Sequence, residues 1–141
     1  MTMKYAVSLF VFFLFASFTL AAPPERTERP LSDYEVLHRA TEFSVGPVGF
    51  AGTTSSTESA FRKVLRTSAA ARDFHGLLSD ATTAGKLYGL LGLKLLKDPE
   101  YATVASRFKV SRAQVSVTSG CITASRPVAE IAKHIDKGDL K

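Results

Sequence analysis

Residues 84–96, A-G-K-L-Y-G-L-L-G-L-K-L-L, restrict what this chain can fold into more than any other segment. On a helix with about 100° per residue, Gly85, Gly89 and Gly92 fall within an arc of about 60°, beside an apolar face of leucines and a tyrosine. Each glycine costs a helix about 1 kcal/mol relative to alanine, so the segment needs compensation from tertiary packing. We therefore expect another helix backbone to approach closely along the glycine arc.

Helix-start signals and apolar spacing predict further helices on both sides of this segment. Ser32 and Ser55 each stand three residues before a glutamate, which is the capping-box pattern. Asp98 followed by proline indicates another helix start, Ser125 is expected to cap a last helix, and Gly138 is expected to end it. The expected helices cover residues 33–43, a segment opening at 55, 70–79, 84–96, 98–108 and 125–138.

Two segments depart from the helical pattern. Residues 44–57 are rich in glycine and hydroxyl side chains, which predicts a flexible connector, and they lack the lysine of a phosphate-binding loop. Residues 114–118 alternate with period two and a turn at 119–120 follows, so a short hairpin with residues 121–124 is expected. The sequence therefore predicts a mainly α fold of short helical hairpins, with a small β-hairpin before the C-terminal helix.

The opening of the chain has the features of an export signal. Lys4 precedes an apolar run at residues 5–18, and small residues then favour cleavage between Ala21 and Ala22. An uncleaved membrane anchor is the alternative, because residues 5–22 form a stretch of 18 residues and a spanning helix needs about 20. The predicted organisation is a signal peptide over residues 1–21, a proline-rich flexible tether over 22–30 and a single mainly helical domain over 31–141.

The charge of the chain is modest and scattered. The sequence has 18 basic and 13 acidic residues, a formal net charge of +5, and its lysines and arginines are dispersed along the chain. A surface that binds nucleic acid would gather these residues on one face, with aromatic side chains between them. A solvated basic surface is therefore favoured, and nucleic acid is not an expected partner.

Candidate chemistry centres on Cys121, the single cysteine, which can form no intrachain disulfide. With His75 or His134 it could form a thiolate–imidazole pair. Its apolar-alternating segment favours a small buried hydrophobe instead, and intermolecular pairing is a further option. The histidines lack the i, i+4 spacing and the neighbouring cysteines of a zinc site. No catalytic residue, cofactor or metal is therefore predicted, and Cys121 is a candidate free thiol.

The sequence resembles two groups of proteins. The pattern A-G-K-L-Y-x-L-x-G-L at residues 84–93, the later Gly120-Cys121 pair and the V-x-x-I spacing of residues 128–131 resemble a group of uncharacterised exported bacterial proteins. Residues 74–108 resemble the paired-helix units of HEAT-type repeat proteins. The first resemblance implies export, and the second implies helical hairpins that present a contact surface.

These observations favour an exported helical protein that works by contact, as a protein-interaction or envelope-associated structural module without catalysis. Its partner would be an unidentified protein or an envelope component, and the sequence indicates no oligomeric state. A second hypothesis is a thiol-dependent redox or hydrolytic protein centred on Cys121. A third is a peripheral protein that an uncleaved leader tethers to the membrane.

Overall fold

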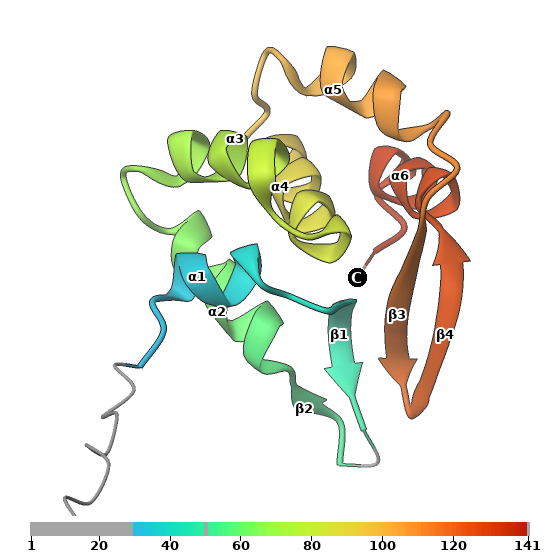
Figure 1. The fold of residues 1–141 in the computed structure, drawn as a ribbon. Helices are drawn as coiled ribbons and strands as arrows, with labels where there is room; N and C mark the ends of the chain where they lie inside the picture. Colours follow the sequence, from blue (N-terminus) through green and yellow to red (C-terminus); the bar gives the residue numbers. More distant parts are fainter. Residues whose placement is uncertain (1–29, 50, 141) are drawn as a thin grey trace, which may run out of the picture.

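In the part of the chain that the structure describes, six helices and a four-stranded mixed sheet make up the domain (Figure 1). The computed structural model describes residues 30–49 and 51–140, of which 53% are helical and 20% lie in strands. The prediction of a mainly α fold of HEAT-like hairpins is therefore wrong. The predicted leader, its cleavage site at Ala21 and Ala22, and residues 22–29 of the predicted tether lie outside the described residues.

The sheet has the strand order β2-β1-β3-β4 and brings distant segments together. β3 (Gln114–Gly120) and β4 (Ile122–Pro127) pair antiparallel, which confirms the predicted hairpin. β1 (Glu42–Val48) lies parallel to β3, and the short β2 (Thr53–Thr54) pairs antiparallel with β1. Residues 44–57, predicted as an irregular connector, thus supply most of β1 and all of β2.

Glycine conformation explains why β1 does not look like a strand in the sequence. Gly46 has a φ of 93°, which side chains rarely adopt. It lies where the register between β1 and β3 shifts, between Ser44 and Val48. An irregularity of this kind interrupts the period-two alternation that identifies a strand.

The helices begin and end close to several of the predicted positions. Their bounds are α1 (Asp33–His38), α2 (Ser56–Leu65), α3 (Ala70–Asp80), α4 (Thr83–Leu95), α5 (Tyr101–Phe108) and α6 (Val128–Lys137). The capping box of Ser32 and Glu35 is formed, and Gly138 ends α6 in a left-handed conformation with a φ of 77°. Both features were expected from local sequence alone.

Three predicted helix ends are wrong, because strands or a turn occupy the residues instead. α1 ends at His38 rather than at residue 43, because the chain then turns into β1. Asp98 accepts a hydrogen bond from the Glu100 N–H at 2.9 Å, but this closes a turn, and α5 begins only at Tyr101. Ser125 lies in β4, so Pro127 is the residue before α6.

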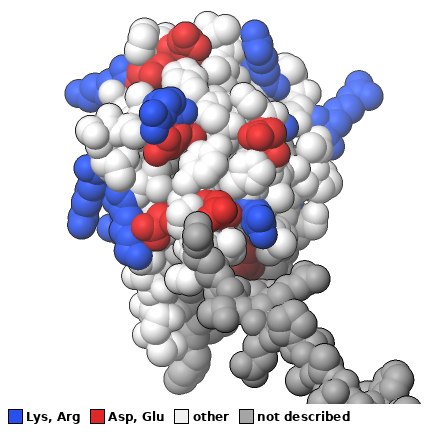
Figure 2. Space-filling view, turned by 60° about the vertical axis from the view of Figure 1, so that its left-hand side comes forward, with Lys and Arg blue, Asp and Glu red and all other residues white. Residues whose placement is uncertain are grey.

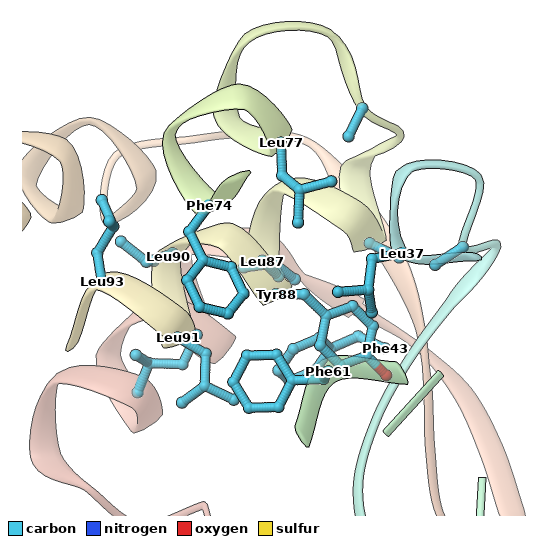
Figure 3. Close-up of a cluster of buried hydrophobic side chains, with 14 of the residues drawn as sticks. Leu37, Phe43, Phe61, Phe74, Leu77, Leu87, Tyr88, Leu90, Leu91 and Leu93 are labelled. Atoms are coloured by element: carbon cyan, nitrogen blue, oxygen red, sulfur yellow. The ribbon is translucent and has the colours of Figure 1, made fainter. Parts of the chain in front are cut away.

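A buried cluster around α4 joins the helices to the sheet (Figure 3). The ring of Tyr88 lies 4.8 Å from that of Phe43 in β1 and 5.7 Å from that of Phe61 in α2. Phe61 in turn contacts Phe74 of α3, with ring centroids 5.5 Å apart. Most of α4 is buried, so this helix forms the centre of the core rather than a surface helix with one apolar stripe.

The glycines of α4 lie against the backbones of two other helices. A Cβ atom built on Gly85 would lie 2.5 Å from the carbonyl oxygen of Leu37 in α1. One on Gly89 would lie 2.9 Å from the carbonyl oxygen of Phe74, and one on Gly92 would lie 2.4 Å from the Phe74 ring. Side chains at these three positions would therefore push α1 and α3 away from α4.

A polar network ties β1 to α2 and α4 inside the core. The Tyr88 hydroxyl donates to the Ser44 carbonyl at 2.8 Å and accepts from the Ser44 N–H at 2.9 Å. The Glu58 side chain, only 3% exposed, accepts from the Gly46 N–H at 2.9 Å and pairs with Arg62. Ser55 caps α2 as predicted, but the Glu58 carboxylate binds the strand instead of closing a capping box.

Candidate functional site

A groove runs beside α5, where α3, α4, α5 and α6 meet, and we call it the α5 groove. Its volume is about 400 Å³, within the range of pockets that hold small ligands. Most of its lining residues are apolar, and two cations and two hydroxyl groups line it as well. The lining residues are Leu78, Thr83, Lys86, Val104, Arg107, Phe108, Ser111, Ala113 and Val128.

The groove exists because α5 rests on the domain along a narrow stripe. Ala105 is its buried residue, while Tyr101, Val104 and Phe108 are half-buried and pack against the edge of the core. These four positions follow the i, i+3, i+4, i+7 spacing of an amphipathic helix. Because the central buried side chain of α5 is only an alanine, apolar surface stays uncovered beside Val104 and Phe108.

Lys86 and Arg107 carry the positive charge of the groove. Neither side chain forms an ion pair with any residue that the structure describes. Lys86 is half-buried and Arg107 is exposed, and both line the groove. Because Lys86 is half-buried beside apolar side chains, its charge is screened less than that of a fully exposed lysine, so an anionic group here would be bound more strongly than at the open surface.

Asp136 of α6 fixes the position of α5. Its carboxylate lies 2.6 Å from Lys109 Nζ and accepts a hydrogen bond from the Tyr101 hydroxyl at 3.0 Å. Lys94 donates to the Asp136 carbonyl at 3.1 Å and lies over the Tyr101 ring. The hydrogen bonds from Lys109 and Tyr101 lower the pKa of Asp136, while burial and the Asp136 hydrogen bond raise that of Tyr101.

Asp136→Asn is expected to lower the melting temperature at neutral pH. The uncharged amide cannot form ion pairs with the ammonium groups of Lys94 and Lys109, as the carboxylate does. Since the pKa of Asp136 is lowered on folding, its contribution is present above the ordinary aspartate value of about 3.9 and is lost as the pH falls further. The difference in melting temperature between wild type and variant should therefore narrow below about pH 4. Thermal unfolding from neutral pH into acid measures this, and an unchanged difference would contradict it.

Cys121 is exposed in the turn between β3 and β4, so the prediction that it is buried is wrong. The alternation that suggested burial stops at this residue, because Gly120 turns the chain with a φ of 57°. The two histidines weighed as its partners are engaged elsewhere. His75 lies 3.2 Å from Asp98, and His134 lies 3.5 Å from Asp139. Among the described residues, no thiolate–imidazole hydrogen bond is formed.

Exposure at a turn predicts how Cys121 behaves. Iodoacetamide should modify it in the folded protein at a rate within about threefold of that in urea, because no unfolding is needed to reach the thiol. Cys121→Ser should change the free energy of unfolding by less than about 0.5 kcal/mol, as at other exposed sites. Modification that is slow until the protein unfolds would show instead that the thiol is protected.

The charged side chains outside the groove are mixed in sign. Figure 2 shows lysines and arginines interspersed with acidic residues on the face that includes α1, α2 and α3. Lys63 pairs with Asp33 at 3.1 Å, and Arg72 with Asp73 at 3.4 Å. Within residues 30–49 and 51–140, no three histidine, cysteine or acidic side chains gather where they could hold a metal ion. No helix in the same ranges has the length and apolar character to cross a bilayer.

Sequence reasoning did not find the α5 groove, because its residues come from four helices and a linker and share no local motif. A lysine within an apolar helical segment, Lys86 in residues 84–93, is the sequence signal that could have indicated it. Cys121 and the glycines of α4 lie elsewhere in the fold. No protein-family model, no curated protein and no solved structure matches this chain.

Proposed function

We propose that this chain is an exported, non-catalytic binding module, and that the α5 groove is its contact surface. The ligand has an apolar part and an anionic group. One observation carries the proposal: Lys86 and Arg107, neither with an acidic partner among the described residues, line a groove whose other lining residues are mostly apolar. Convergence of a few charged groups on an apolar concavity is typical of ligand sites.

Support for export comes from the sequence. The basic start, the apolar run and the small residues before Ala22 are those of a cleavable leader, and the A-G-K-L-Y-x-L-x-G-L pattern resembles exported bacterial proteins. The partner is then an envelope component or another exported protein. Mass spectrometry of the product outside the cytoplasm tests this, since a first residue at Ala22 supports export and an intact Met1 contradicts cleavage.

Binding can be tested with anilinonaphthalene sulfonate, a probe with an apolar ring system and an anionic sulfonate. We expect saturable fluorescence enhancement with the folded protein. Lys86→Gln combined with Arg107→Gln should weaken probe binding at least tenfold, because each charged hydrogen bond contributes about 1.5–3 kcal/mol. Near-UV circular dichroism must stay native, since this probe also binds loosened states.

The matched control is Arg66→Gln combined with Lys133→Gln. This pair removes the same two residue types from exposed positions that lie outside the groove and outside the described ion pairs. It should leave probe binding within about twofold of wild type, because distant exposed charges are largely screened by salt. If both double variants weaken probe binding equally, the effect is due to net charge alone, and the proposal is overturned.

A further inference from the structure

We infer that the ligand of the α5 groove is a single-chain acyl carboxylate, such as a fatty acid. This inference rests on the proposed function and specifies its ligand. It depends on the two chemically different kinds of side chain that line the groove. We call the larger apolar residues, Leu78, Val104, Phe108 and Val128, its apolar part, and the polar residues, Lys86, Arg107, Thr83 and Ser111, its polar part.

The apolar part suits a hydrocarbon chain. Its four side chains come from α3, α5 and α6 and offer no hydrogen-bonding group. A peptide backbone placed there would lose its hydrogen bonds to water and find no replacement, which is costly, whereas methylene groups lose nothing. The volume of about 400 Å³ lies near the lower end of the range for ligand pockets, which favours one chain over two.

The polar part suits a carboxylate. An arginine can bind both carboxylate oxygens through its planar fork, and a lysine adds a point charge. Lys86 and Arg107 stand on different helices, α4 and α5, so a carboxylate between them would join the two. The hydroxyl groups of Thr83 and Ser111 supply further donors.

A flat anionic bilayer surface fits the described charges less well. Binding to such a surface requires several cations gathered on one face. Here Lys63, Arg72, Lys109 and Arg126 are each paired with an acidic side chain. Lys86 and Arg107, which have no acidic partner among the described residues, lie instead beside the apolar lining of the groove, where a single amphiphile can reach them.

The test is displacement of anilinonaphthalene sulfonate by straight-chain carboxylates from hexanoate to dodecanoate, below their micelle concentrations. Affinity should rise about fourfold per added methylene, from about 0.8 kcal/mol per buried methylene, until the groove is filled, and should then level off. The alcohol of the same chain length should bind at least tenfold more weakly. Lys86→Gln with Arg107→Gln should abolish that preference, and Arg66→Gln with Lys133→Gln should retain it.

The outcomes separate this inference from the proposed function. If the probe binds in the groove but chain length has no effect, the acyl inference is overturned and the binding module stands. Displacement by vesicles of anionic phospholipid, or by an acidic peptide, without displacement by carboxylates also overturns it. If Lys86→Gln combined with Arg107→Gln changes neither the affinity of the probe nor that of the carboxylates, both proposals are overturned. Leu78→Gln, with an unchanged near-UV spectrum, should weaken carboxylate and alcohol alike.

Discussion

Gly92→Ala is expected to lower the free energy of unfolding by about 2–3 kcal/mol, although alanine is the better helix former by about 1 kcal/mol. The added methyl carbon would lie 2.4 Å from two atoms of the Phe74 ring and 2.5 Å from a third. Phe74 is fully buried between α3, α4 and Phe61, so the ring has no space into which it can turn. Urea-induced unfolding at neutral pH measures the loss.

Gly76→Ala in the neighbouring helix α3 is the matched control. Its methyl carbon would meet the hydroxyl of Tyr34 at 2.9 Å, which is the far end of a flexible and half-buried side chain. Tyr34 can move aside, so the helix propensity of alanine should dominate and stability should change by less than about 1 kcal/mol, in the favourable direction. Two equal losses would mean that backbone conformation, rather than contact with α3, decides the effect at residue 92.

Glu58→Ala should cost about 2–3 kcal/mol, because it leaves the buried Gly46 N–H without an acceptor and removes the partner of Arg62. The Glu58 carboxylate is the link between α2 and the irregular part of β1. The loss should also loosen the sheet edge, since β2 pairs with the end of β1 at Pro47 and Val48. Urea-induced unfolding measures the loss in the free energy of unfolding, and faster amide hydrogen exchange at Gly46 would show that this part of β1 is loosened.

Glu58→Gln distinguishes the hydrogen bond from the charge. The amide oxygen can still accept from the Gly46 N–H, while the pairing with the partly exposed Arg62 is lost. An exposed partner regains its hydration, so this variant should lose about 1 kcal/mol or less. A loss as large as that of the alanine variant would place the stabilisation in the ion pair instead.

Helix positions were predictable wherever the signals are local. The capping box at Ser32, the serine cap at residue 55 and the glycine at 138 depend on contacts within one turn, and all three occur. The predicted start at Ser125 failed because β4 pairs with β3 and takes that residue into the sheet. A local cap is worth about 1 kcal/mol, which strand pairing and burial can exceed.

The sheet and the groove depend on residues that are distant in sequence. Glu42 belongs to a strand because Ser116 lies beside it, and no pattern within residues 42–54 indicates that partner. Lys86 lies in a groove because α5 crosses nearby, and the glycine arc indicates only which side of α4 is packed. The signals for helices and caps thus lie within a few residues, whereas those for β1 and the α5 groove arise only from the tertiary fold.

The parallel pairing of β1 with β3 has a consequence for the order of assembly. Glu42 and Thr118, bonded across these strands, are separated by 76 residues. Such a contact closes a long loop, and proteins dominated by contacts of this kind fold slowly. While the chain emerges from the ribosome, β1 therefore has no parallel neighbour until residues 114–120 have also been made. A chain that must stay unfolded to pass through a membrane channel would gain time from this delay.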